Sequence, residues 1–287
     1  TYFGERIFDS DREGIGMRTA TGLKRKQAES VGVWQRTGAK TIHWNKLSAI
    51  LSMKWGTQFS KNFISMPLFS VGITVAMTLF YGSMAKSRGG ELEDSIRAMA
   101  LSLGALMNTT MTGILCTGMA LAEEKEKHTL RALMTSSVNG LEFFLGSTLP
   151  VAAMIMIVNI LLVPASGLRP SAAGWVMWLT VSALCSIAST VVGMIFGICC
   201  KSQVSASTVI SIPILILVMI PVFAEFSGFM EKISRLLFTG VLSRASAALA
   251  ESAPQVDIFG LGVIGAEILL AALVFVLLYR QNGYERD

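Results

Sequence analysis

Long apolar stretches separated by short charged segments set the pattern of this chain. A bilayer core of about 30 Å needs roughly 20 apolar residues in a helix, and six stretches reach that length. We expect membrane spans at about 63–84, 98–122, 143–166, 173–198, 203–223 and 258–279. Gly and Pro inside these stretches do not exclude them, because neighbouring helices satisfy the backbone groups that such residues free. The pattern predicts an all-α polytopic membrane protein with six transmembrane helices.

Two further apolar patterns predict shorter helices beside the spans. Before the first span, apolar residues recur at spacings of three and four, with lysines off that stripe; they are Trp44, Leu47, Leu51, Trp55 and Phe59. This spacing is typical of an amphipathic helix lying in the membrane interface, although it also fits the start of a long first span. Before the last span, apolar residues from Phe226 to Leu237 follow a helical period, and a small-residue stretch comes next. We expect a short outer helical hairpin there.

The composition favours a membrane protein over a soluble one. Hydrophobic residues make up 52% of the chain and charged residues only 15%, whereas a soluble domain carries about 25% charged residues. All four Cys lie in apolar stretches and the chain has two His, so we expect neither a metal site nor a disulfide scaffold. Residues 1–41 are basic and lack an apolar period. We expect them to form a poorly ordered arm ahead of a transmembrane domain at 42–287, with no nucleic acid as partner.

The distribution of positive charge predicts the orientation. Six spans place both termini on one side, and a cytoplasmic N-terminus puts 17 of the 24 Lys and Arg residues inside. The positive-inside rule favours this arrangement, although most of the excess comes from the N-terminal arm. We expect a multi-pass protein of the cell membrane with both termini in the cytoplasm.

A run of charged residues follows the second span without a Gly or Pro break. The segment reads Glu123-Glu124-Lys125-Glu126-Lys127-His128-Thr129-Leu130-Arg131-Ala132-Leu133. Helical spacing would bring Leu130 and Leu133 to one side, among charges of both signs. An apolar centre with a polar rim suits contact with a partner protein; a solvated loop is the alternative interpretation.

The run E-E-K-E-K-H-T-L-R-A-L-M-T-S-S-V, followed by G-L-E-F-F-L-G-S, resembles the cytoplasmic signature of type-2 ABC transporter permeases. The resemblance covers the plan from about Trp44 to Arg280. It implies that residues 123–135 form a coupling helix, which docks on a separate ATPase subunit. The residues that it assigns to this coupling are Glu123, Glu124, Lys125, Glu126, Lys127, Thr129, Leu130, Arg131 and Leu133.

The same resemblance implies the rest of the assembly. Two ATPase copies would pair with two permeases, as a homodimer or a heterodimer, in an ATP-driven export system. This chain has no G-x-x-x-x-G-K-[ST] motif, which cradles phosphates in P-loop enzymes. We therefore expect ATP and magnesium in the partner ATPase, and no enzyme activity in this permease.

Three polar residues inside the spans are candidates for a substrate pathway: Asn108, Asn159 and Glu267. An ionisable group within a span is costly and points to function. The two Asn residues fit either a polar route or hydrogen bonds between helices. An amphipathic peptide or a hydrophobic drug is the expected substrate class, with a lipid-linked glycan as an alternative. An ion-coupled carrier or channel that uses Glu267 is the alternative function.

Overall fold

The computed structural model describes residues 48, 51–52, 54–56, 61–87, 89–90, 92–127, 140–224, 226–251 and 257–282. The predicted arm at 1–41 lies outside these residues. Within them every secondary-structure element is a helix. The longer elements are α3 (Lys61–Ser87), α4 (Asp94–Met107), the π-helix η1 (Asn108–Cys116), α5 (Thr117–Glu126), α7 (Gly140–Ser166), α8 (Ala172–Cys199), α9 (Gln203–Phe223), α10 (Gly228–Ser234), α11 (Phe238–Ala248) and α12 (Ile258–Asn282).

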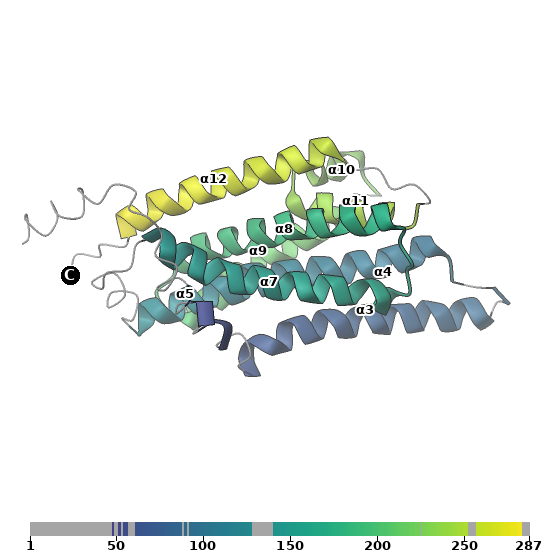
Figure 1. Ribbon diagram of the computed structural model, residues 1–287, viewed down its shortest axis with the longest axis horizontal. Helices are drawn as coiled ribbons and strands as arrows, with labels where there is room; N and C mark the ends of the chain where they lie inside the picture. The colour runs from purple at the N-terminus through teal and green to yellow at the C-terminus, as the bar shows by residue number, and fades with distance from the viewer. Residues whose placement is uncertain are drawn as a thin grey trace, which may run out of the picture. The chain divides into compact units, whose positions relative to one another are not determined.

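Six helical segments are long and apolar enough to cross a membrane, and they confirm the predicted spans. They run over Ile64–Ser87, Asp94–Glu126, Phe143–Ser166, Ala172–Cys199, Gln203–Phe223 and Ile258–Leu278. Their ribbons lie alongside one another in Figure 1. The second span is longer than predicted, because α4, η1 and α5 continue one another and carry the helix into the charged run. The chain is an all-α polytopic membrane protein.

The bundle has two distinct ends. The α8–α9 turn, the end of α5 and the start of α7 lie at the left in Figure 1, and we call this the charged end. The α3–α4 and α7–α8 connections lie at the right with α10, and we call this the hairpin end. Serine caps set the short turns: the Ser171 hydroxyl accepts from the Gly174 N–H and begins α8, and the Ser202 hydroxyl accepts from the Ser205 N–H and begins α9, each at 3.2 Å. Such caps satisfy backbone donors that a helix start leaves free.

The second and fourth spans form the centre of the bundle. Most residues in the apolar windows of these two spans are buried, whereas few residues in the windows of the first and last spans are. Leu68 on α3 and Leu269 on α12, for example, are 70% and 73% exposed. In a bilayer such side chains face lipid, where exposure has no hydrophobic cost. The described residues therefore bury their core around α4, η1, α5 and α8.

Glycines let the two central spans approach closely. A Cβ added at Gly193 of α8 would lie 2.7 Å from the Ile114 carbonyl oxygen of η1. A Cβ at Gly197, one turn along α8, would lie 2.7 Å from the Gly118 carbonyl oxygen of α5. Real Cβ atoms essentially never come so close. The small residues at 193 and 197 thus set the separation of these helices, as is common between membrane helices.

The second span contains nine residues of π-helix, Asn108–Cys116. Its hydrogen bonds run from residue i to i+5, so each turn holds more residues than an α-turn. Seven of the nine residues are buried. The wide turns therefore lie in the centre of the bundle, between the part of the span that begins at the hairpin end and the part that reaches the charged end.

Two short helices, α10 and α11, lie before the last span, where the hairpin was predicted. Helix α11 packs against α4, α8, α9 and α12, whereas α10 packs on α9 and α11. Glu267 of α12 contacts Phe238, the first residue of α11. Glu267 lies nine residues after Ile258, which is about 14 Å along a helix. The turn between α10 and α11, with Phe238 at the start of α11, is called here the tip of the hairpin. It therefore reaches about halfway into a bilayer core of about 30 Å.

Candidate functional site

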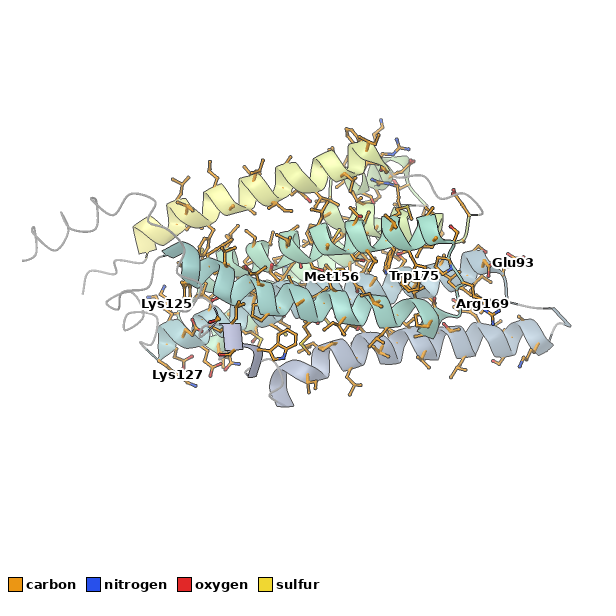
Figure 2. All side chains as sticks on the ribbon, in the orientation of Figure 1. Glu93, Lys125, Lys127, Met156, Arg169 and Trp175 are labelled. Carbon is orange, nitrogen blue, oxygen red and sulfur yellow. The ribbon has the colours of Figure 1, made fainter. Side chains whose placement is uncertain are left out.

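Residues Glu123 to Lys127, which we call the charge cluster, form the last residues of α5 and its C-cap at the charged end of the bundle. Lys125 and Lys127 lie at this end in Figure 2, far from Glu93, Arg169 and Trp175 at the other. The helix continues through Glu126 because the second span has no break before the charges. Predicted coupling residues Thr129, Leu130, Arg131 and Leu133 lie outside the described residues.

Glu124 forms an ion pair with Lys54, whose backbone is helical in the segment before the first span. Lys54 is 8% exposed, and its Nζ lies 5.6 Å from the centre of the Phe143 ring near the start of α7. Its side chain thus contacts residues at both ends of the 128–139 segment. Burial lowers the pKa of Lys54 to about 8. The nearby Glu123 carboxylate raises this pKa, but its effect is smaller than that of burial.

The next two residues of the charge cluster fasten α5 to the α8–α9 turn. Lys125 Nζ donates to the Ile198 carbonyl oxygen at 3.1 Å, near the end of α8. Glu126 Oε2 accepts from the Gln203 backbone N–H at 3.0 Å, at the start of α9. A cation at a helix C-terminus and an anion at a helix N-terminus both complement the helix dipole. Both contacts therefore hold the helix ends in favourable electrostatic positions.

The remaining pair of the cluster lies on the surface. Lys127 Nζ contacts Glu123 Oε1 at 2.5 Å, with the Lys127 side chain 64% exposed. The hydrogen bond and the charge of Glu123 raise the pKa of Lys127. An exposed pair of this kind adds little to stability. Within the described residues, Glu126 and Lys127 are the exposed members of the cluster, whereas Glu123 is half-buried.

The structure brings two of the three predicted pathway residues together. Asn108 Nδ2 donates to Asn159 Oδ1 at 2.8 Å and lies 3.1 Å from the Ile155 carbonyl oxygen. Thr112 donates to Asn108 Oδ1 at 3.1 Å, and Trp178 Nε1 donates to the Asn159 carbonyl oxygen at 3.1 Å. Both Asn residues are fully buried. This geometry matches the interpretation of hydrogen bonds between helices, here joining η1, α7 and α8; a role in a substrate pathway stays a prediction.

Glu267, the third of these residues, bonds to a different element. Its Oε2 accepts from the Phe238 backbone N–H at 2.8 Å. The carboxylate therefore meets the start of α11 at the tip of the hairpin. Whether it also serves a substrate pathway stays a prediction.

The predicted interfacial stripe is described at two of its five positions. Leu51 is half-buried and Trp55 is 39% exposed, whereas Trp44, Leu47 and Phe59 lie outside the described residues. The pattern places Lys54 off the apolar stripe, on the basic side of the helix, and in the structure this lysine is buried against α5 and α7. Its ion-pair partner Glu124 lies 70 residues later in the sequence, and no local pattern around Lys54 indicates that pairing.

The spacing of Gly193 and Gly197, four residues apart in a span, could have indicated close helix packing from the sequence.

Potential metal ligands are scattered. Across the described residues, no group of three or more His, Cys, Asp and Glu side chains could hold a metal ion. The polar contacts described above are ion pairs and hydrogen bonds at helix ends, which position helices relative to one another.

Comparison with known proteins decides the family. The family model described as ABC-2 type transporter matches residues 49–238. The chain belongs to the ABC-2 type transporter family. No curated protein matches it. The match to the ABC-2 family covers the charge cluster, both buried Asn residues and the close glycine contacts, and it ends at Phe238. It confirms the resemblance to type-2 ABC transporter permeases and makes the chain a transmembrane component of an ABC transporter. Glu267 lies beyond the matched residues.

Proposed function

We propose that this permease is the transmembrane subunit of an ATP-driven export system, and that residues 123–135 transmit the movement of a separate ATPase subunit to the spans. One observation carries the proposal: consecutive residues of the charge cluster contact three different elements. Glu124 pairs with Lys54, Lys125 donates to Ile198, and Glu126 accepts from Gln203. A displacement of this helix end therefore acts on several helices at once.

The contacts suggest a division of labour along the segment. Residues 128–135, with Leu130 and Leu133 as apolar contacts, dock on the ATPase. Residues 124–126 anchor the other end of the segment to the bundle. Because Lys54 contacts both Glu124 and Phe143, the segment before span one moves with the start of the coupling segment and with the start of α7. ATP and magnesium are bound in the partner, and nucleotide-driven closure of two ATPase copies supplies the movement.

The proposed assembly contains two permeases, either two copies of this chain or one copy with a related one. The charged end faces the cytoplasm, where the ATPase lies, and both termini are on that side of the cell membrane. The second and fourth spans, joined by the contacts at Gly193 and Gly197, carry movement from the charged end towards the hairpin end. The substrate class is an amphipathic peptide or a hydrophobic drug, with a lipid-linked glycan as the alternative.

The experiment separates docking from transmission. The permease is co-expressed with an ABC ATPase subunit that copurifies with the parent chain, and copurification, ATPase activity and export are measured. We expect Leu133→Asp to abolish copurification, because it places a charge in the apolar contact. We expect Lys125→Met to retain copurification but to lose most export, because it removes the bond to Ile198.

A matched control and a contradicting result complete the test. Lys232→Met removes an exposed lysine of α10 at the opposite end of the bundle and should change neither property. Survival of both association and export in Leu133→Asp would show that the 123–135 segment does not couple to an ATPase.

A second function has one specific observation in its favour. Glu267 is an ionisable residue within the last span, and its carboxylate contacts the tip of the hairpin. An ion-coupled carrier or channel would use such a residue without ATP. Purified permease in liposomes lacking any ATPase distinguishes the two functions. Transport driven by an ion gradient alone would favour the second.

A further inference from the structure

Helix α11 begins without a cap from its own chain segment. Its N-cap residue is Leu237, and no side-chain cap bond is made there. The first N–H of the helix, that of Phe238, donates instead to Glu267 Oε2 on α12 at 2.8 Å. Glu267 therefore satisfies, from a different helix, one of the N–H groups that a helix start leaves free, as the side chain of an N-cap Ser or Asp does for a neighbouring N–H.

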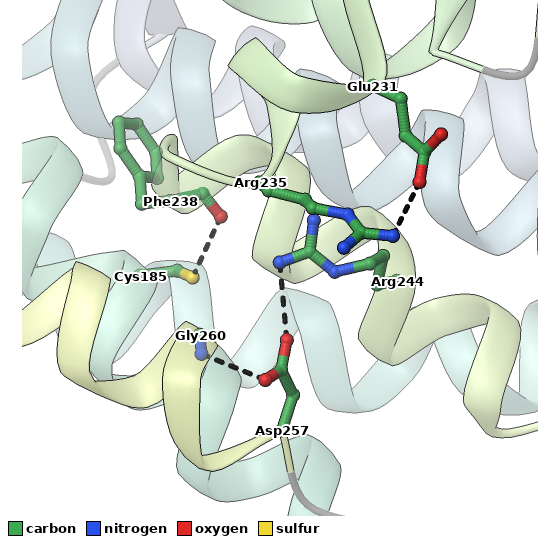
Figure 3. Close-up of polar contacts among 7 residues, drawn as sticks. All are labelled: Cys185, Glu231, Arg235, Phe238, Arg244, Asp257 and Gly260. Atoms are coloured by element: carbon green, nitrogen blue, oxygen red, sulfur yellow. Dashed lines mark hydrogen bonds and ion pairs between the residues drawn. The ribbon is translucent and has the colours of Figure 1, made fainter. Parts of the chain in front are cut away.

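The tip of the hairpin is held from two sides. Cys185 of α8 donates from its Sγ to the Phe238 carbonyl oxygen at 3.4 Å, as Figure 3 shows. The Phe238 side chain is 2% exposed. One residue at the tip thus bonds to α8 through its carbonyl group and to α12 through its N–H group.

Farther along α11, at the rim of the hairpin, Arg244 and Ser243 make weaker contacts than Phe238 does. Arg244 of α11 pairs with Asp257 at 3.3 Å (Figure 3). Both side chains are about a third exposed or more. Such surface pairs contribute little. Ser243 lies within hydrogen-bond distance of Ser102 on α4, with hydroxyls 2.9 Å apart.

The bond at the tip matters more than these rim contacts because of its surroundings. At membrane depth no water replaces a lost acceptor, so an unpaired Phe238 N–H would be costly. The Arg244 and Asp257 side chains are partly exposed, so water can replace a partner that they lose. An oxygen acceptor on the residue 267 side chain is therefore what the tip requires.

We propose that Glu267 is a latch, a positioning residue that holds the α10–α11 hairpin inserted between α8 and α12. When the bond between Glu267 and Phe238 breaks, α11 leaves its seat and the hairpin end of the bundle opens. Because α8 and α12 each hold Phe238, relative movement of these two spans breaks one of the bonds. The latch does not depend on the proposed export function, since hairpin docking is measured on the permease alone.

The test uses a reporter thiol at the tip. Thr239 is fully buried, and its hydroxyl has no hydrogen-bond partner in the described part of the chain, so Thr239→Cys removes no observed bond. Cys199→Ser removes the exposed native thiol, and the other three Cys residues are buried. The full chain in phospholipid nanodiscs is treated with a water-soluble maleimide, and the rate of labelling is measured.

Two substitutions at Glu267 give opposite expectations. Glu267→Gln keeps an oxygen acceptor for the Phe238 N–H, so labelling should stay within about three-fold of the parent rate. Glu267→Leu has a similar volume but no acceptor, and we expect labelling at least about ten-fold faster. Equal rates in the two variants, or no acceleration in Glu267→Leu, would overturn the proposal.

A disulfide separates hairpin release from general unfolding. Ser102→Cys and Ser243→Cys, added to the Glu267→Leu variant, place two thiols where the hydroxyls now lie 2.9 Å apart. Oxidation should tie α11 to α4 and return labelling of the Thr239→Cys reporter towards the parent rate. Fast labelling that persists after the crosslink has formed would mean that Glu267→Leu disrupts the bundle and that no hinged release occurs.

Discussion

The close contact between the two central spans makes a quantitative prediction. In Gly193→Ala the new Cβ would lie 2.7 Å from the Ile114 carbonyl oxygen and 2.8 Å from that of Gly113. Ordinary contact begins at 3.4 Å, so α8 must move about 0.7 Å from η1. The obstructing atoms belong to the backbone and cannot rotate away. Overpacking of this kind costs about 1–3 kcal/mol, of which the better helix propensity of Ala returns up to about 1 kcal/mol.

Gly197→Ala should have a similar effect, because its Cβ would lie 2.7 Å from the Gly118 carbonyl oxygen. Both substitutions are relieved by the same separation of the helices, so the double variant should lose less stability than the two single losses together. Thermal unfolding of the purified permease in nanodiscs, followed by intrinsic tryptophan fluorescence, measures the loss. We expect each single variant to unfold a few degrees below the parent.

A matched glycine provides the control. A Cβ added at Gly265 of α12 would meet no atom within 4 Å, so Gly265→Ala should be neutral or slightly stabilising. If Gly193→Ala unfolds at the same temperature as Gly265→Ala, the reasoning from close approach is wrong.

Three further predictions concern buried polar groups. Lys54→Met should lower the free energy of unfolding by about 3 kcal/mol, because it removes the buried positive charge beside Glu124; adding Glu124→Gln should recover much of the loss, and a double-mutant cycle by thermal unfolding measures it. The second prediction concerns pH. Because burial lowers the pKa of Lys54 to about 8 from 10.5, the unfolded chain holds this proton between those pH values and the folded chain does not. Stability of the parent relative to Lys54→Met should therefore rise from pH 8 to 10.5, and a flat or falling difference would contradict the lowered pKa. Asn159→Leu should cost about 1–2 kcal/mol, because the Asn108 amide loses an acceptor in the membrane interior; Asn108→Leu/Asn159→Leu should cost less than that single change, as measured by the same unfolding assay.

Most of the fold could be predicted from the sequence, because the bilayer imposes a length and a composition on each span. The two helices of the hairpin were also predictable, since residues 226–237 keep a helical period within a connection between spans. The pattern could not predict how deeply the hairpin enters the membrane. The bond between Phe238 and Glu267 places the tip inside the membrane, and it joins residues whose pairing depends on how α12 packs against α8.

The candidate site was predictable in part. The charge run after span two indicated that Glu123 to Lys127 are unusual. Composition alone does not say which of these residues contact other parts of the same chain and which are left for a partner protein. Glu124, Lys125 and Glu126 are bound to Lys54, Ile198 and Gln203, partners that lie in three other segments. Long-range pairing of this kind arises from tertiary packing, and a single sequence carries no local signal for it.

The π-helical stretch has a consequence for the direction in which the second span presents its charges. In an α-helix each residue advances the side chains by about 100° around the axis, and every additional residue taken up by a wide turn rotates all that follows by that angle. Asn108 begins the stretch Asn108–Cys116, and the charge cluster lies beyond its end. A substitution that restored ordinary turns there would rotate Glu124 and Lys125 away from their partners while leaving their chemistry unchanged. The direction in which the charge cluster points is thus set by the π-helix in the middle of the span, several turns before the residues that make contact.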